Sequence, residues 1–364
     1  MQDKLQETIE YLKAKGASYA DIRFVRNEVE SIKVTNENVD TLSRTLNHGF
    51  GIRVLADGAW GFASSSTVRA AEFRKIANQA LKIAKASAIT KKEDVRLDEG
   101  QVYVDKYQTP FETDPFKVRL SRKINMLTKI NQALMKKPEI KIAESSMGFF
   151  KTHKIFVNRE GSVIEQELLE SGAGYAATAV EGSEVQRRSF PNSQGGDYMT
   201  GGFEIVENMG LQKNAARVRE EAIELLSAPP LPAGEADIII GASQMALQVH
   251  ESCGHPTELD RVLGTEISLA GGSFMTIDKL NSLKYGSDIV SIVHDATCPG
   301  GLGTFGYDDE GVKAQRMPLI ENGRFVGYLT SRETAGVVGQ NSNGCMRADG
   351  FNRIPLIRMT NINL

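Results

Sequence analysis

The sequence predicts an α+β fold: an N-terminal α/β module with a curled antiparallel sheet and long helices, followed by a mostly β C-terminal domain. Three observations predict it. Four stretches carry apolar residues at helical spacing, several others are apolar and β-branched in the manner of strands, and the segment APPLPAGEAD interrupts both patterns. We place domains at 1–110, 111–227 and 228–364.

The first domain is expected to combine helices with a hairpin-rich sheet. Apolar residues at helical spacing predict a helix over 3–15. The segments ADIRFVR, SIKVTNENV and GFGIRVLADGAWGFASS predict strands, with Asp57-Gly58 as a hairpin turn. A second helix then begins at a cap provided by Ser66 or Thr67 and ends near residue 85.

The middle domain is expected to repeat this mixture. A helix from 114 to about 137 precedes two strand segments, EIKIAESSMGFFKTHKIFVN and SVIEQELLESGAGYAATAV, which are joined by a turn at 159–161. A further helix covers about 210–227. The clustered prolines of APPLPAGEAD cannot be helical, so this segment predicts a stiff linker. After it, ADIIIG predicts a buried strand that leads directly into another helix.

Composition limits the classes of partner. With 364 residues, 41% hydrophobic and 24% charged, the chain is typical of a soluble globular protein. A net charge of -3 gives no positive field for nucleic acid. Three cysteines are too few for a disulfide framework, and no run of about 18 apolar residues predicts a membrane span. We therefore expect a cytoplasmic protein that binds neither nucleic acid nor membrane.

The stretch VHESCGHPTELD, residues 249–260, carries the clearest chemistry. In the zinc-protease pattern H-E-x-x-H, two histidines one helical turn apart bind the metal and the glutamate acts as a base. Here the pattern is H-E-x-x-x-H, formed by His250, Glu251 and His255. Five residues turn a regular helix by about 140°, so the two imidazoles would point to different faces.

Two local structures would bring the histidines together. Gly254 and Pro256 predict that the helix ends before His255, which would then turn back toward His250; a bulged last turn would have the same effect. Glu258 and Asp260 follow, and each is either a further ligand, an acceptor that orients an imidazole, or part of a solvated acidic turn. Cys253 fits a small buried side chain better than a ligand.

A second motif, GLGTFG at 301–306, matches the dinucleotide pattern G-x-G-x-x-G. A dinucleotide site also needs a helix that opens at the third glycine, and the following YDDEGVKAQRMP does not predict one. We expect a glycine-rich loop near the active site instead.

Several blocks together resemble the TldD/PmbA family of metalloproteases: HESCGHPTELD, GGLGTFGYDDEG, ENGRFVGYLTSRETA and PLIRMTN, with GFGIRVLADGAWGFASS near the N-terminus. The motif-bearing subunits of that family are of the TldD type, which this sequence resembles. The resemblance implies zinc (Zn2+) bound by His250 and His255, and Glu251 as general base and acid. It also implies a homodimer, or a heterodimer with a PmbA-like subunit, that processes leader or precursor peptides and degrades unstructured proteins.

The resemblance also implies a third ligand, a cysteine in a C-terminal segment beyond the R-M-T-N block. The sequence ends at Leu364, soon after that block, so we expect a truncated chain and an incomplete metalloprotease domain over 228–364. Cys345 does not match the family's cysteine. An alternative function is therefore a non-catalytic peptide-binding or assembly subunit, inactive because it lacks the third ligand.

Overall fold

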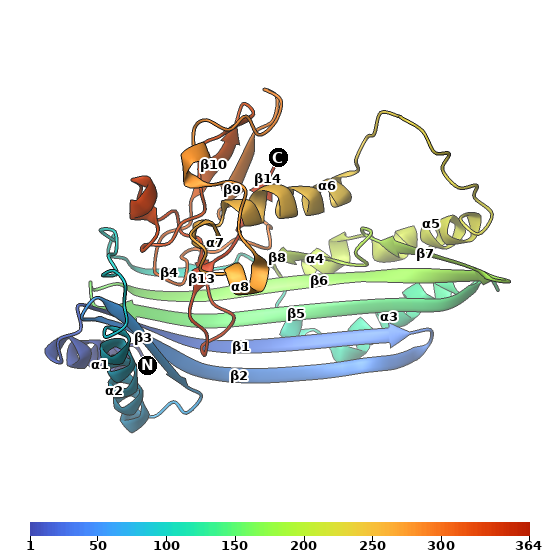
Figure 1. The fold of residues 1–364 in the computed structure, drawn as a ribbon. Coiled ribbons are helices and arrows are strands. Elements are labelled where there is room, and N and C mark those ends of the chain that lie inside the picture. Colours follow the sequence, from blue (N-terminus) through green and yellow to red (C-terminus); the bar gives the residue numbers. More distant parts are fainter.

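One eight-stranded sheet dominates the computed structural model, which describes the backbone of residues 1–364 and all side chains except those of 269 and 270 (Figure 1). The strand order is β3-β2-β1-β5-β6-β4, and β7 and β8 also pair with β6. Neighbouring strands are antiparallel except for the parallel pair β4 and β6. The strands are β1 Tyr19–Thr35, β2 Asn38–Ala56, β3 Ala59–Ser65, β4 Val104–Gln108, β5 Ile140–Asn158, β6 Val163–Glu181, β7 Glu184–Phe190 and β8 Asp197–Thr200.

Helices pack near both ends of the long strands. Successive side chains of a strand point to opposite faces of the sheet. On β1, Ile22 and Ile32 lie on the face that the helices cover. Asp21 and Arg23 point to the other face, where they contact Arg53 and Asp309. One core contains α1 and α2, and the other contains α3 and α5. These helices are α1 Gln2–Ala14, α2 Ala70–Ser87, α3 Leu120–Leu134, α4 Glu204–Asn208 and α5 Leu211–Glu224.

The predicted α+β class is confirmed, and so is the hairpin at Asp57 and Gly58, whose φ angles of 52° and 75° suit a tight turn. Two helix starts are wrong. The second helix begins at Ala70 without a side-chain cap, so neither Ser66 nor Thr67 caps it. The third begins at Leu120, because Asp114 instead caps the short 3-10 turn Pro115–Lys117 by accepting a hydrogen bond from the backbone N–H of Phe116.

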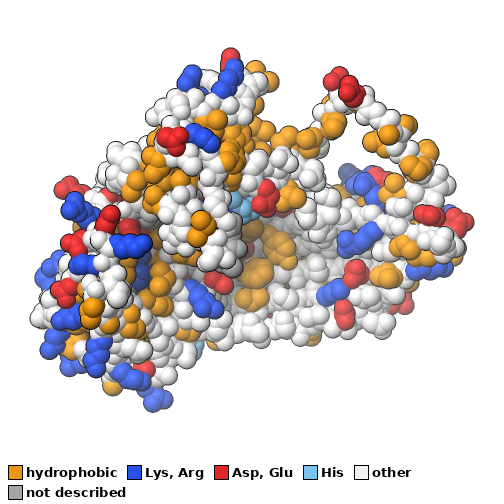
Figure 2. All heavy atoms as spheres, viewed as in Figure 1, with side chains coloured by type: hydrophobic (Ala, Val, Ile, Leu, Met, Phe, Trp, Pro, Cys, Tyr) orange, Lys and Arg blue, Asp and Glu red, His pale blue; other side chains and the backbone are white. Residues whose placement is uncertain are grey.

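The C-terminal part consists of short elements that lie over one end of the large sheet (Figure 1). Its own sheet has the order β11-β10-β9-β14. Figure 2 shows the molecule hollowed between this part and the large sheet, with hydrophobic side chains on the floor of the hollow. The elements are α6 Ala242–Val249, a π-helical turn His250–Gly254, 3-10 turns His255–Thr257, Ile277–Lys279 and Ala335–Val338, α7 Leu259–Val262, α8 Ile267–Ala270, β9 Ile292–Asp295, β10 Arg316–Glu321, β11 Arg324–Phe325, β12 Met346–Arg347, β13 Leu356–Ile357 and β14 Asn361–Asn363.

The segment between α5 and α6 arches away from the body of the molecule (Figure 1). The predicted strand ADIIIG is wrong: residues 236–241 form no strand, and Ile238 and Ile239 are 81% and 99% exposed. A strand requires a hydrogen-bonded neighbour, and none of the described strands pairs with this segment.

The domain boundaries at 110 and 227 stay predictions. Among the described residues, we find no helix with the length and apolar character needed to cross a membrane.

Buried charges attach the C-terminal part to the large sheet. Asp309 lies 3.5 Å from a guanidinium nitrogen of Arg23 and 2.5 Å from Nζ of Lys154, and Glu310 accepts a hydrogen bond of 3.0 Å from Arg53. Burial alone would raise the pKa of Asp309, but Lys154 and Arg23 hold it below its usual value. These pairs cross from β1, β2 and β5 to the loop before β10, so they fix the position of the C-terminal part.

Candidate metal centre

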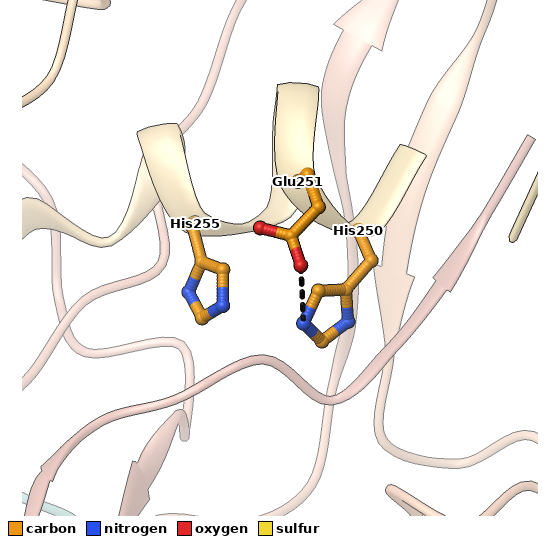
Figure 3. Close-up of side chains that lie close together, drawn as sticks. All are labelled: His250, Glu251 and His255. Atoms are coloured by element: carbon orange, nitrogen blue, oxygen red, sulfur yellow. Dashed lines mark ion pairs between the residues drawn. The ribbon is translucent and has the colours of Figure 1, made fainter. Parts of the chain in front are cut away.

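The two histidines of the motif are joined by a π-helical turn at the end of α6. The backbone N–H of His255 donates to the carbonyl of His250, five residues earlier. A π turn holds one residue more than an α turn, so it places His255 about one turn after His250 instead of 140° around the axis. Both imidazoles and the carboxylate of Glu251 therefore project from the same side of the helix (Figure 3).

The expectation that the helix ends before His255 is wrong, and the bulged turn is what forms. His255 has helical angles, with φ -59° and ψ -42°, and begins the 3-10 turn His255–Thr257. Pro256 is tolerated there because the first turn of a helix does not need its missing N–H.

Gly254 packs closely against the side chain of Met359 and does not end the helix. A Cβ atom at this position would lie 1.9 Å from Sδ of Met359, and the backbone of the turn touches the chain just before β14 at this point. Only glycine permits this close approach without displacement of Met359.

The side chains of His250, Glu251 and His255 form one compact donor set. One ligand atom from each lies within 4.8 Å of the others, and the two imidazole rings are 4.7 Å apart and nearly perpendicular, at 89°. Nitrogen and oxygen ligands on one tetrahedral zinc ion are separated by roughly 3.3 to 3.6 Å, so small side-chain rotations would suit such an ion. Two imidazole nitrogens and a carboxylate oxygen are donors that zinc accepts, and the geometry fits a single cation.

The electrostatics favour the metal-binding form of His250. Burial lowers the pKa of its imidazole, and the neighbouring His255 lowers it further, while Glu251 and Glu258 raise it in part. A histidine must be neutral to offer a lone pair to a metal. At neutral pH the lowered pKa keeps His250 in that state.

Glu258 holds the second histidine in place. Its Oε2 lies 3.0 Å from Nδ1 of His255, and the same oxygen accepts hydrogen bonds of 2.9 and 3.1 Å from Arg261. Glu258 is fully buried, and residues on both sides of it are hydrogen-bonded to the backbone of Leu329. With Nδ1 occupied in this way, Nε2 is the atom of His255 that remains for a metal.

Asp260 lies outside the donor set and binds backbone N–H groups instead. Its two oxygens accept hydrogen bonds from the backbone N–H groups of Arg261 and Ile357, which ties the segment after the motif to β13. Burial raises the pKa of Asp260 to about 6. Asp260 does not belong to the donor set of His250, Glu251 and His255.

The cysteines lie away from the donor set within the described part of the chain. Cys253 is fully buried, as the sequence predicts for a small core side chain, and Cys345 is buried with its Sγ 3.8 Å from Nδ1 of His294. No sequence pattern indicates two further residues, Glu266 and Arg358, which extend the contacts of Arg261. They are distant in sequence from the motif, and no spacing rule links them to it.

The glycine-rich stretch 301–306 is a loop, and no helix opens at Gly306, as expected. Gly303 donates its backbone N–H to Oδ1 of Asn361, and a Cβ at Gly303 would lie 2.6 Å from the backbone of Thr360. These glycines allow the loop to pack tightly against β14.

Replacing Glu258 by alanine is expected to reduce zinc affinity about 10- to 100-fold, because His255 loses the carboxylate that orients it. Competition with a chromophoric chelator measures the affinity. Glu258→Gln keeps an acceptor for Nδ1 and is expected to recover part of it. The control is Asp288→Ala, whose side chain is 81% exposed. Equal affinities in Glu258→Ala and the wild type would show that Glu258 does not position the ligand.

Comparisons with known proteins identify what this chain is similar to. Residues 233–364 match the family model described as the PmbA/TldA metallopeptidase C-terminal domain, and residues 20–84 match the one described as domain 1. A metalloprotease of Methanocaldococcus jannaschii is 32% identical over 358 residues, which cover 98% of this chain and 75% of that protein. A protein of Saccharolobus solfataricus named zinc metalloprotease TldD homolog is 25% identical over 360 residues, covering 95% of this chain and 72% of the homolog.

Solved structures share the fold. A protein of Thermotoga maritima superposes with a TM-score of 0.74 at 20% identity, covering 97% of this chain and 76% of the other. TldE of Thermococcus kodakarensis superposes with a TM-score of 0.71 at 17% identity, covering 99% and 77%. The family models and the relative from Methanocaldococcus jannaschii lead to one conclusion: this chain belongs to the TldD/PmbA family of metallopeptidases.

Proposed function

We propose that the chain is a zinc-dependent metallopeptidase that hydrolyses unfolded or extended peptides, including leader and precursor peptides and unstructured proteins. The observation that supports this most is the π-helical turn, which brings His250, Glu251 and His255 to one side of the helix. A relative at 25% identity carries the name zinc metalloprotease, which supports zinc as the metal.

Each side chain has a role in this proposal. His250 and His255 bind the metal, and Glu258 fixes the orientation of His255. Bound zinc would polarise the scissile carbonyl and make a water molecule more acidic. Glu251 takes the proton of the attacking water and later passes it to the leaving amine. Its carboxylate suits this task because the side chain is 62% exposed, so it is accessible to water.

The shape beside the motif suits an extended substrate. β14 is the edge strand of the C-terminal sheet and contacts α6, which leads into the motif. An extended peptide can add to such an edge through backbone hydrogen bonds, with little dependence on its side chains. We also propose that the chain works as a homodimer or as a heterodimer with a PmbA-like subunit, and the fold that it shares with TldE supports a partner of the same architecture.

A second candidate is a non-catalytic subunit that binds peptides or supports assembly. The donor set in the described part of the chain has two imidazoles and one carboxylate. If Glu251 acts as the base, two protein ligands remain, whereas zinc sites usually have three or four.

Zinc analysis together with a cleavage assay separates these candidates. For the peptidase we expect one zinc per chain and hydrolysis of a labelled unstructured peptide that a chelator abolishes and added zinc restores. The double variant His250→Ala/His255→Ala should lose both zinc and cleavage. Purified wild-type protein that holds no stoichiometric zinc and leaves the peptide intact would favour the non-catalytic subunit.

A further inference from the structure

A groove of about 790 Å3 lies beside the loop that connects β12 and β13. Its volume is within the range of small-molecule and peptide-side-chain sites. Phe62 of β3 forms one wall, and the loop and its strands form the rest. The lining residues are Phe62, Arg347, Ala348, Asp349, Asn352, Arg353, Ile354, Leu356 and Arg358.

The groove is positively charged, although the whole chain has a net charge of -3. Three arginines line it, against the single carboxylate of Asp349. Within the described residues, no ion pair involves the guanidinium of Arg347 or Arg353. Burial of its guanidinium lowers the pKa of Arg347, and the carboxylates of Asp309 and Glu170 offset this effect in part. Two guanidinium groups are therefore available to an anionic ligand.

A continuous series of ionic contacts connects the groove with the candidate metal centre. Arg358 lines the groove and donates to Glu266 at 2.8 Å, and Glu266 in turn lies 3.3 Å from Arg261. Arg261 donates to Glu258, which contacts His255. Three side chains, Glu266, Arg261 and Glu258, thus link the groove to a metal-binding histidine, and all three are buried.

The lining chemistry identifies the class of ligand. Arginine binds carboxylates through paired hydrogen bonds, and it does so best where water is partly excluded. Phe62, Ile354 and Leu356 add apolar surface beside the arginines, which suits the aliphatic part of a peptide. A small inorganic anion would leave this apolar surface uncovered.

We propose that this groove is a subsite that binds a carboxylate of the peptide substrate, from either an acidic side chain or the C-terminus. The subsite rests on the proposed peptidase function and gives it a preference for peptides that bring a carboxylate to the groove. The groove would recognise the negative charge of a carboxylate and would not select a particular amino-acid sequence.

The test compares three peptides that share one cleavable core. The first has internal glutamates and an amidated C-terminus, the second has glutamines at the same positions and an amidated C-terminus, and the third is the glutamine peptide with a free C-terminus. We expect kcat/KM to be about five- to tenfold higher for one or both carboxylate peptides than for the neutral one, mainly through KM. The first and third peptides distinguish the two sources of the carboxylate.

The variant Arg347→Gln/Arg353→Gln should reduce this ratio to about one. The control Arg316→Gln removes an arginine on β10 whose side chain is 62% exposed and lies outside the groove, and it should keep the ratio. Wild-type protein that cleaves all three peptides equally would overturn the subsite and leave the peptidase proposal standing.

If none of the peptides is cleaved, fluorescence anisotropy of labelled peptides still tests the groove. Tighter binding of a carboxylate peptide that depends on Arg347 and Arg353 would support the subsite while the peptidase proposal fails. Equal binding of all three peptides, or binding that the double variant leaves unchanged, would overturn it.

Discussion

Replacing Glu251 by alanine is expected to lower kcat for peptide hydrolysis by about 10²- to 10⁴-fold while zinc content stays at the wild-type level. The carboxylate lies beside both imidazoles, with Oε1 3.9 Å from Nε2 of His250, so it is placed to move a proton at the reacting centre. The two histidines remain as ligands in the variant. Steady-state kinetics on an unstructured peptide and elemental analysis of the same preparation measure the two quantities.

The matched control is Glu321→Ala, which removes an exposed carboxylate at the end of β10. It should leave both cleavage and zinc content unchanged. If Glu251→Ala lost zinc together with activity, Glu251 would be a ligand. If it cleaved peptide at the wild-type rate, the base would be another group.

Replacing Asp309 by alanine is expected to destabilise the protein by about 3–5 kcal/mol, because it leaves two cations without their shared carboxylate. Arg23 is 1% exposed, and Lys154 is held 2.5 Å from Asp309. Arg23 cannot recover its hydration without opening the contact between the C-terminal part and the large sheet, and Lys154, 13% exposed, can do so only in part. The pKa of Asp309 is lowered, so the stabilisation that it provides is present above the unfolded pKa and is lost as pH falls through the folded value.

The only tryptophan in the chain provides a local probe for this effect. Trp60 lies on β3 and donates its indole N–H to Glu333 in the C-terminal part, at 2.9 Å. Urea unfolding followed by its fluorescence should show an earlier transition for Asp309→Ala. In contrast, Asp288→Ala removes one member of an exposed pair and should change the stability by less than about 0.5 kcal/mol. Equal transitions for Asp309→Ala and the wild type would mean that water or other groups already compensate Arg23 and Lys154.

Local patterns were sufficient where local interactions decide the structure. Apolar spacing located α1 and α5 to within a few residues, and Asp57-Gly58 marked a hairpin because both positions adopt positive φ. Helix starts were less predictable. Asp114 is a good cap in sequence, but it caps a 3-10 turn ahead of the helix, and α2 begins without a side-chain cap.

Residues that depend on distant partners were predicted less well. The isoleucines of ADIIIG have strand propensity, yet a strand forms only beside another strand. Asp308, Asp309 and Glu310 form an acidic run that is typical of a surface, but all three are buried, because arginines and a lysine from the large sheet face two of them and backbone N–H groups bind the third. Nothing in the sequence near residues 308–310 indicates those partners.

The candidate site shows both situations. The identities of His250, Glu251 and His255 were evident from the motif, and a bulged turn was one of two ways to bring them together. The bulged turn that forms has the hydrogen bond from His255 to His250, and its Gly254 packs against Met359. Met359 is more than a hundred positions further along the chain, so this contact is visible only in the folded protein.

The π-helical turn also relates this motif to the shorter one. A π turn is an α turn with one residue more, so deleting Ser252 or Cys253 would restore the H-E-x-x-H interval by letting this turn become α-helical. The residues after the deletion would keep nearly the same place, so Glu258 would stay buried beside Leu329 and would keep its contact with His255. The two intervals are therefore two ways to place the same donor set, and an exchange between them needs only a local change in the backbone of the turn.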